Sequence, residues 1–247
     1  MQLTVIGSGD AFSSGGRLHP CFHVSFGTTK LLIDCGATAL IGLRRAGLDP
    51  NEIETIVLSH LHGDHFAGII WLLLYGQHPG QRQSPLTIYG PVGTEQRIRQ
   101  AYDVLYPGAA DVPSRFPVSY VTFDVNSEIG LLGGRMRTYA AQHPSGAPST
   151  MLRFEIADKV LAYSGDTEWS DDLLPCAEQA DLFITECFSR EKPIRYHLDW
   201  PTLARNVPHL TARRILLTHM SQSMLDNPPE PTDPRVSFAD DGQVIVI

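Results

Sequence analysis

The sequence is short of positive charge and has no paired cysteines. Its 247 residues carry 19 Lys plus Arg against 27 Asp plus Glu, a formal net charge of -8. Proteins that bind nucleic acid along its backbone are usually basic, so we expect no stable nucleic-acid partner. The four cysteines are isolated and form no CxxC pair. This spacing excludes a disulfide scaffold and a cysteine-based zinc knuckle, and it favours reduced thiols in a cytoplasmic protein.

Long hydrophobic runs are also missing. The longest, residues 66–76, is much shorter than the roughly 20 residues that a transmembrane helix needs, so we expect it to form a buried helix. The first ten residues lack the basic and apolar regions of a signal peptide, and we expect no membrane association. Apolar residues make up 43% of the chain, which predicts a packed core. No repeat or linker interrupts the chain, so we expect a single domain over residues 1–247.

Short apolar and β-branched runs alternate with helical segments along the chain. The pattern predicts strands at residues 3–8, 21–26, 30–35, 53–60, 86–90, 119–124, 135–142, 151–157, 159–164, 181–187 and 213–219. It predicts helices at residues 37–46, from about 64, and at 94–105, 171–179 and 201–207. The closing residues 236–247 predict a hairpin that turns at Asp241-Gly242. Strands mixed with helices in this way predict an α/β protein in which helices flank the sheets.

The densest chemical signal is an HxHxDH motif that begins at His60, where a predicted strand ends. In an extended chain, His60 and His62 point to the same side and can hold one metal ion. Asp64 and His65 follow at the start of a helix, turned toward a second position. Neutral imidazoles together with a carboxylate suit a borderline divalent ion such as zinc.

Three further strands end at residues that can ligate a metal: His143, Asp166 and His219. A single histidine after a strand is more often a hydrogen-bonded core or surface residue, and an aspartate after Ser-Gly is more often a turn residue. Four such strand ends in one chain, one of them HxHxDH, favour a shared metal site. We also expect Asp34, which follows an apolar strand, to be buried and to hydrogen-bond a ligand histidine.

The motifs resemble, in order, those of the metallo-β-lactamase fold superfamily, and within it the ribonuclease Z-like and phosphodiesterase-like branch. The similar segments are GSGDAFSSGGR at 7–17, LLIDCG at 31–36, LSHLHGDHFAG at 58–68, the His143-Pro144 pair, YSGDT at 163–167 and LLTHMS at 216–221. The resemblance covers residues 3 to 247. It implies an αββα sandwich with two divalent metal ions, most often Zn²⁺ with Mn²⁺ or Fe²⁺ as alternatives, at one edge of the paired sheets.

The resemblance also implies which residues hold each metal ion. His60, His62 and His143 would hold the first ion, and Asp64, His65 and His219 the second. Asp166 would bridge the two ions, and Asp64 would also orient a water molecule between them. Glu186 ends a predicted strand, and His197 follows eleven residues later. In related enzymes such a glutamate orients such a histidine, which protonates the leaving alkoxide.

These features predict a metal-dependent hydrolase, with a phosphodiesterase acting on a small-molecule phosphodiester as the leading hypothesis. Ribonuclease Z is one alternative, but its tRNA-gripping arm has no room in the 23 positions from His143 to Asp166, and the His-Leu-Asp at 197–199 departs from its usual motif. Hydrolysis of a carboxylic ester, lactone or thioester is another alternative. So is a role like that of the pyrroloquinoline quinone biosynthesis member, in which hydrolysis is not clear. The branch commonly forms homodimers, and the basic loop from Arg190 to Arg195 either binds substrate or is solvated.

Overall fold

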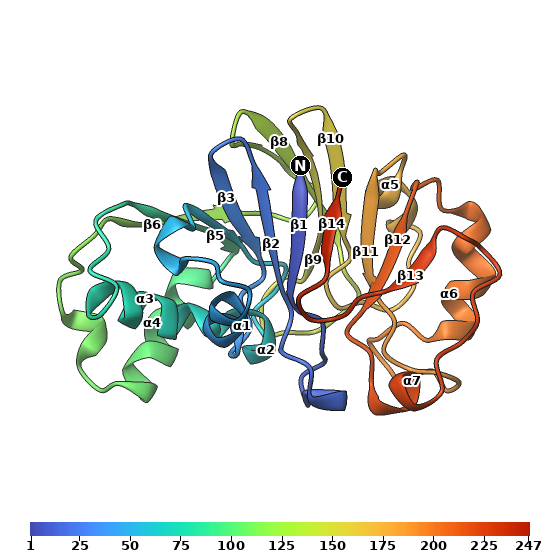
Figure 1. Ribbon diagram of the computed structural model, residues 1–247, viewed down its shortest axis with the longest axis horizontal. Helices are drawn as coiled ribbons and strands as arrows, with labels where there is room; N and C mark the ends of the chain where they lie inside the picture. The colour runs from blue at the N-terminus through green and yellow to red at the C-terminus, as the bar shows by residue number, and fades with distance from the viewer.

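The computed structural model describes residues 1–247 and arranges them as two β-sheets that face each other, with helices on both outer sides (Figure 1). Each sheet has seven strands. The helices of the first half of the chain cover one sheet, and those of the second half cover the other. The four layers therefore run helix, sheet, sheet, helix, which is the αββα sandwich that the motifs imply.

The first sheet has the strand order β14-β1-β2-β3-β4-β5-β6. Its pairings are antiparallel from β14 to β3 and parallel from β3 to β6. Strand β4 is buried along its whole length, as expected for a parallel strand that is covered on both faces. The strands are β1 (Gln2–Gly7), β2 (Cys21–Phe26), β3 (Thr29–Ile33), β4 (Thr55–Val57), β5 (Leu86–Pro91), β6 (Val118–Phe123) and β14 (Val244–Val246).

The second sheet has the order β13-β12-β11-β10-β9-β8-β7. Its pairings are parallel from β13 to β10 and antiparallel from β10 to β7, so each sheet contains three pairings of each kind. The strands are β7 (Glu128–Leu131), β8 (Gly134–Ala140), β9 (Thr150–Ile156), β10 (Lys159–Tyr163), β11 (Leu182–Glu186), β12 (Ile215–Thr218) and β13 (Val236–Phe238).

The helices are short, and α4 is the longest at 12 residues. Helix α6 begins where the Asp199 side chain accepts a hydrogen bond from the backbone N–H of Thr202, a typical N-cap. No helix is long and apolar enough to cross a lipid bilayer. The α-helices are α1 (Ala39–Arg45), α2 (Gly63–Phe66), α3 (Gly68–Gln77), α4 (Thr94–Leu105), α5 (Leu173–Ala177), α6 (Trp200–Asn206) and α7 (Gln222–Asp226). Single 3₁₀ turns lie at Ser14–Gly16, Pro50–Glu52, Ala109–Asp111 and Val207–His209.

Three hydrophobic clusters hold the layers together. A cluster of 20 buried residues, including Phe22 and Tyr163, fills the space between the two sheets. The rings of these two residues meet edge to face, with centroids 5.3 Å apart, a favourable aromatic geometry. The second cluster packs helices α1, α3 and α4 on the first sheet, and the third packs α5, α6 and α7 on the second sheet. The apolar run at 66–76 lies mainly in α3, where most residues are buried.

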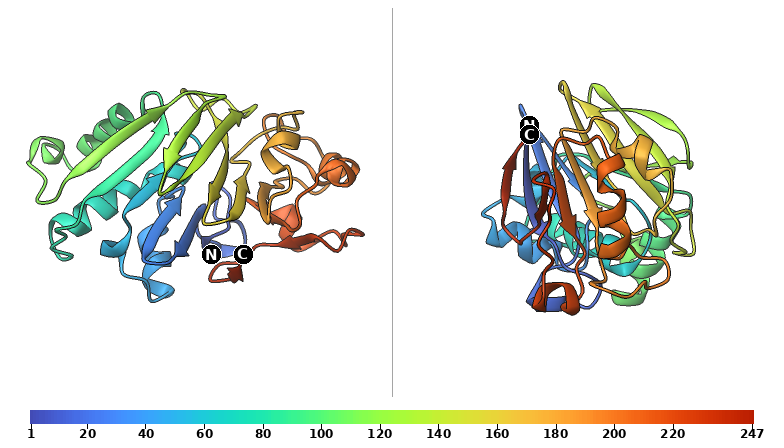
Figure 2. Two further views of the ribbon diagram at one scale, coloured as in Figure 1. Left: turned by 90° about the horizontal axis from the view of Figure 1, so that it is seen from above. Right: turned by 90° about the vertical axis from the view of Figure 1, so that its right-hand side faces the viewer.

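One topological prediction from the sequence is wrong. Residues 236–247 do not form a hairpin, because β13 pairs with β12 in the second sheet and β14 pairs with β1 in the first. The turn itself exists, since Gln243 N–H donates to Asp240 O. The Asp241 carboxylate, however, accepts hydrogen bonds from the Ser8 and Leu18 backbones. These contacts direct the chain from one sheet to the other and bring the two termini side by side (Figure 2).

Candidate metal centre

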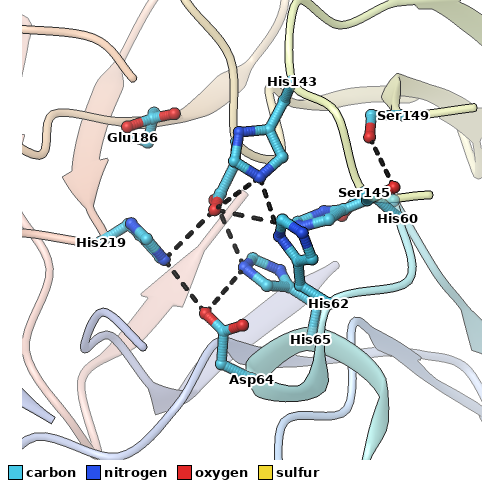
Figure 3. Close-up of polar contacts among 12 residues, drawn as sticks. His60, His62, Asp64, His65, His143, Ser145, Ser149, Glu186 and His219 are labelled. Atoms are coloured by element: carbon cyan, nitrogen blue, oxygen red, sulfur yellow. Dashed lines mark hydrogen bonds and ion pairs between the residues drawn. The ribbon is translucent and has the colours of Figure 1, made fainter. Parts of the chain in front are cut away.

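The seven predicted ligand residues meet at one edge of the two sheets, and Figure 3 labels all of them except Asp166. Each follows the carboxyl end of a strand, which is where polar ligand sites commonly form in α/β folds. The first sheet supplies the HxHxDH segment after β4, with Asp64 and His65 in the single turn of α2. The second sheet supplies the residues that follow β8, β10 and β12. Five of the seven are buried, namely His60, His65, His143, Asp166 and His219, and His62 and Asp64 are half-buried.

Three histidines form the first group of donors. His62 Nδ1 lies 2.9 Å from His143 Nε2, and the ring of His60 stands edge-on to both. Their ligating atoms all lie within 4.8 Å of one another. Three imidazole nitrogens that converge in this way match the donor set of a zinc site with one open position.

A second group consists of two histidines and two carboxylates. His65 Nε2 and His219 Nε2 each lie 3.3 Å from Asp64 Oδ2. Asp166 lies between the two groups: its Oδ1 is 3.3 Å from His65 Nε2, and its Oδ2 is 3.8 Å from His143 Nε2. Asp166 is therefore the one carboxylate placed to serve both positions.

The spacing of these atoms fits metal ions. Ligands that bind zinc tetrahedrally at 2.0–2.1 Å are separated by roughly 3.3–3.4 Å along each tetrahedral edge, close to the separations within the second group. Several ring and carboxylate atoms are buried without any hydrogen-bond partner: His60 Nε2, His65 Nε2, Asp166 Oδ1 and His219 Nδ1. Buried polar atoms are rarely left unpaired. The first three of these atoms face the centre of the cluster, so the residues present fit divalent metal ions.

Asp34, directly after β3, holds part of this centre in place. Its carboxylate contacts His65 Nδ1 at 2.7 Å and accepts hydrogen bonds from the Ser59 backbone N–H at 2.7 Å and from Ser59 Oγ at 2.8 Å. Asp34 is fully buried. The position expected for it from the sequence is confirmed, and its contact leaves Nε2 of His65 free to face the metal site.

Two further contacts orient the histidines of the first group. Ser59 Oγ lies 3.0 Å from His60 Nδ1, and His143 Nδ1 lies 2.9 Å from the Tyr196 carbonyl oxygen. In both rings the opposite nitrogen, Nε2, is directed into the centre. The roles of Ser59 and of the Tyr196 carbonyl were not evident from the sequence, because a serine between a strand and a histidine has no distinctive pattern and a backbone carbonyl has none at all.

Burial and nearby charges shift the pKa values of these histidines in opposite directions. Burial lowers the pKa of His60, His62 and His143 and keeps them in the neutral form that binds metal. Burial acts in the same direction on His219, but the Asp166 carboxylate and the hydrogen bond to Asp64 outweigh it and raise the pKa of His219 to about 9. Without metal, the second group therefore holds protons that an incoming ion must displace.

Glu186 and His197 form a separate pair beside the cluster. Glu186 is fully buried at the end of β11, and its Oε2 lies 3.1 Å from His197 Nδ1. Its other oxygen accepts a hydrogen bond from the Thr167 backbone N–H. The His197 ring stacks on His219 with centroids 5.6 Å apart and meets His143 edge-on at 4.9 Å. The structure thus places both residues of the predicted proton-donor pair next to the metal cluster.

The charge on His197 follows from the same contacts. Burial acts to lower the pKa of His197, but the hydrogen bond and charge of Glu186 outweigh it and raise the pKa. Burial raises the pKa of Glu186 itself. A raised pKa favours the protonated form of the imidazole, which is the form that can donate a proton.

The basic side chains near the site contact backbone carbonyls and one aromatic ring. Arg190 donates to the Asn227 carbonyl, and Arg195 lies over the Tyr196 ring at 4.6 Å from its centroid. Arg97 on α4, which the sequence did not single out, donates to the carbonyl of Leu61, the residue between His60 and His62. It has no carboxylate partner within 4 Å. Residues 191–195 are exposed, and Arg190 is half-buried.

The chain has the metallo-β-lactamase fold, and its His/Asp cluster is a candidate centre for divalent metal ions. The chain belongs to the family described as anti-Pycsar protein Apyc1, which matches residues 1–245. A 106-residue segment is 38% identical to ribonuclease Z from Methanococcus maripaludis, and it covers 43% of this chain but only 33% of that protein. The match therefore spans about a third of this relative's length.

Two relatives match over nearly the whole chain. The protein named probable metallo-hydrolase YhfI from Bacillus subtilis is 27% identical over 228 residues, which cover 89% of this chain and 87% of YhfI. Its crystal structure superposes with a TM-score of 0.79 at 21% identity, covering 99% of this chain and 98% of that one. A diphosphatase from the PhnP family gives a TM-score of 0.80 at 20% identity, covering 100% and 97%. At these identities the structural likeness shows the fold.

Proposed function

We propose that this chain is a dinuclear metal-dependent phosphodiesterase that hydrolyses a small phosphodiester. The observation that carries the proposal is the Glu186–His197 pair beside the His/Asp cluster. A cluster alone suits many hydrolytic reactions, whereas a histidine that holds a proton beside it suits reactions whose leaving group needs that proton. The absence of a cysteine from the cluster and the position of Asp166 between its two halves also support the proposal.

We assign the ligands as the sequence predicts. His60, His62 and His143 would hold one ion and Asp64, His65 and His219 the other, with Asp166 contacting both. The donor set, five imidazoles and two carboxylates with no soft thiolate, suits Zn²⁺ and also accommodates Mn²⁺ or Fe²⁺. When bound, two such ions supply Lewis acidity toward a phosphoryl oxygen and lower the pKa of a bound water.

The side chains of this chain would carry out the remaining steps. The half-buried Asp64 carboxylate would accept a hydrogen bond from the attacking water and so orient it. His197, held by Glu186 through Nδ1, would present its Nε2–H to the leaving oxygen and protonate the departing alkoxide. The ring is already fixed by its stacking on His219 and Phe188, so little reorganisation is needed for this transfer.

The test compares two leaving groups. A p-nitrophenolate departs readily without a proton, whereas an alkoxide does not. We expect His197→Ala to slow hydrolysis of an alkyl phosphodiester by about 10²–10⁴-fold, the usual value of a general acid. The loss for bis-p-nitrophenyl phosphate should be much smaller, and metal content should be unchanged. Glu186→Gln should show the same selectivity in weaker form.

His62→Ala is the matched comparison, because it removes a proposed ligand and should damage both substrates alike. Equal slowing of both substrates by His197→Ala, or loss of metal from that variant, would remove His197 from the role of acid. Parallel assays with a p-nitrophenyl carboxylic ester separate a phosphodiesterase from an esterase, lactonase or thioesterase. A higher rate with the carboxylic ester would contradict the proposal.

The family to which the chain belongs is described as an anti-Pycsar protein. We propose that this chain also acts against Pycsar, and that it does so through hydrolysis at this site. The ribonuclease Z alternative is less well supported. The segment between His143 and Asp166 consists of the β9–β10 hairpin and its flanking loops, which leaves no extension to grip a tRNA. A small-molecule phosphodiester therefore remains the proposed substrate.

A further inference from the structure

The loop that carries His197 is anchored to the site through Tyr196 as well as through His197 itself. Between Ser189 and His197 the chain has no helix or strand, and residues 191–195 are exposed. Tyr196 has a φ of 72°, a left-handed conformation that is uncommon for a residue other than glycine, asparagine or aspartate and that persists only where surrounding contacts enforce it.

Both backbone polar groups of Tyr196 are hydrogen-bonded within the site. Its carbonyl oxygen contacts Nδ1 of His143 at 2.9 Å, and its N–H donates to Oε1 of Glu168 at 2.5 Å. The other contacts of the loop lie elsewhere: His197 N–H donates to Ile194 O within the loop, Arg190 donates to the Asn227 carbonyl, and Arg195 covers the Tyr196 ring. The Glu168 carboxylate is thus the acceptor that holds the strained residue from outside its loop.

Glu168 is itself well fixed. It follows Asp166 and Thr167 directly, its N–H donates to Gln142 O at 3.3 Å, and its carbonyl accepts from Thr167 Oγ1 at 2.7 Å. Thr167 Oγ1 in turn accepts the Gln142 N–H at 2.9 Å. Glu168 therefore lies in the segment after β10, which carries Asp166 and is hydrogen-bonded to the segment after β8, which carries His143. From there its carboxylate reaches the loop of His197.

We propose that Glu168 is a positioning residue that sets two active groups at once. By holding Tyr196 in its left-handed conformation, it aims the Tyr196 carbonyl at His143 and places His197 in reach of Glu186. The inference rests on the proposed function, in which His143 is a metal ligand and His197 the leaving-group acid. One carboxylate outside the metal cluster then couples the geometry of the metal site to the geometry of proton transfer.

A variant in which residue 168 cannot accept a hydrogen bond from the Tyr196 N–H should lose this geometry. Tyr196 would relax toward negative φ, which rotates its carbonyl away from His143 and shifts the attachment point of His197. Misplacement of a reacting group by about 1 Å can cost on the order of 10²-fold in rate. The proton-transfer step should suffer most, because His197 is adjacent to the residue that moves.

The experiment compares Glu168→Ala with Glu168→Gln, since a glutamine keeps an oxygen at the acceptor position. We expect Glu168→Ala to lower kcat for an alkyl phosphodiester by on the order of 10²-fold with a smaller change for bis-p-nitrophenyl phosphate. Glu168→Gln should recover most of the rate. Glu191→Ala, an exposed carboxylate in the same loop with no hydrogen bond or ion pair, is the matched control and should leave both rates unchanged.

A second measurement does not depend on activity. Hydrogen–deuterium exchange of the metal-free protein should show a protected Tyr196 amide in the wild type and in Glu168→Gln, and fast exchange at that amide in Glu168→Ala. Similar exchange in all three proteins would overturn the proposal. So would a loss in Glu168→Ala that is equal for both leaving groups.

The failure of this proposal can be told apart from failure of the proposed function. If His197→Ala is selective for the alkyl diester and Glu168→Ala is not, only the role of Glu168 is wrong. If His197→Ala shows no selectivity, the proton-donor assignment itself is wrong, whatever Glu168→Ala does to exchange at Tyr196.

Discussion

At the scale of single residues, His23 is a buried histidine without a hydrogen-bond partner, and such a group lowers the stability of the folded state. It lies on β2, is 3% exposed, and neither ring nitrogen has a hydrogen-bond partner. Burial lowers the pKa of His23, and the nearby Lys30 lowers it further. Unlike the histidines of the metal centre, His23 belongs to no group of side chains that could hold a metal ion.

We predict that His23→Leu stabilises the protein by about 1–2 kcal/mol at pH 7, because it removes a buried polar group that is not hydrogen-bonded. Urea unfolding measures the change. His209→Leu is the control, since His209 is exposed, and it should give no gain. A loss of stability in His23→Leu would contradict the prediction.

The difference in stability between His23→Leu and the wild type should change with pH in one direction. A histidine whose pKa is lower in the folded state binds its proton more readily in the unfolded state, so wild-type stability falls as the pH drops below about 6.5. Leucine has no such dependence. The stability advantage of His23→Leu should therefore increase between pH 7 and pH 5.5, and a constant difference over that range would contradict the predicted pKa shift.

At the scale of elements, the ends of β3 and β4 cooperate to build half of the metal centre. Asp34 after β3 contacts both His65 and Ser59, and Ser59 contacts His60. We predict that Asp34→Asn lowers metal affinity by about 10–100-fold, the usual effect of removing the outer partner of a ligand histidine. Competition with a chromophoric chelator measures it. Asp233→Asn, which alters a surface pair with Arg235, should leave the affinity unchanged.

The sequence predicted most elements because each depends on a local pattern. Strand β2 and helix α4 agree with the predicted ranges 21–26 and 94–105. Strand β7 was not predicted, since only one residue of Glu128–Leu131 is buried and its apolar signal is weak. The closing hairpin was wrong because Asp-Gly specifies a turn but not the strands on either side of it. Those depend on pairing with β1 and β12, which are far away in the sequence.

The candidate site was predictable to a similar extent, and for a related reason. The side chains that the sequence singled out lie together because each one ends a strand, and strand ends can be identified locally. Contacts made by backbone atoms could not be identified, such as the Tyr196 carbonyl at His143. Glu168 was also not singled out, because its role depends on a loop that lies 28 residues further along the chain.

At the scale of the whole molecule, metal ions should contribute to stability. We predict two equivalents of metal per chain after supplementation with zinc. Chelation should lower the melting temperature by about 10–20 °C, since each of the two ions at 100 times its Kd stabilises by about 2.7 kcal/mol and each kcal/mol shifts a protein of this size by about 2–4 °C. Elemental analysis and calorimetry measure both quantities. A constant single equivalent would contradict the dinuclear assignment.

We also predict that the purified protein does not process precursor tRNA efficiently, although it cleaves small diesters. The reasons are the compact β9–β10 hairpin and the net charge of -8, which repels a polyanion. A 3′-end cleavage assay with ribonuclease Z as the positive control measures this activity. Specific cleavage at a comparable rate would show that another segment replaces the missing arm.

The proposed ligands are divided between the two sheets, four in the segment after β4 and three after strands of the second sheet. Neither half of the chain holds a full set for both ions, and Asp166 from the second half faces donors from the first. Tight binding of metal should therefore follow the docking of the sheets rather than precede it. During folding, metal would bind at a late step and stabilise the contact between two halves that have already formed. A protein produced without metal would consist of correctly formed sheets whose shared edge is held less firmly than their core.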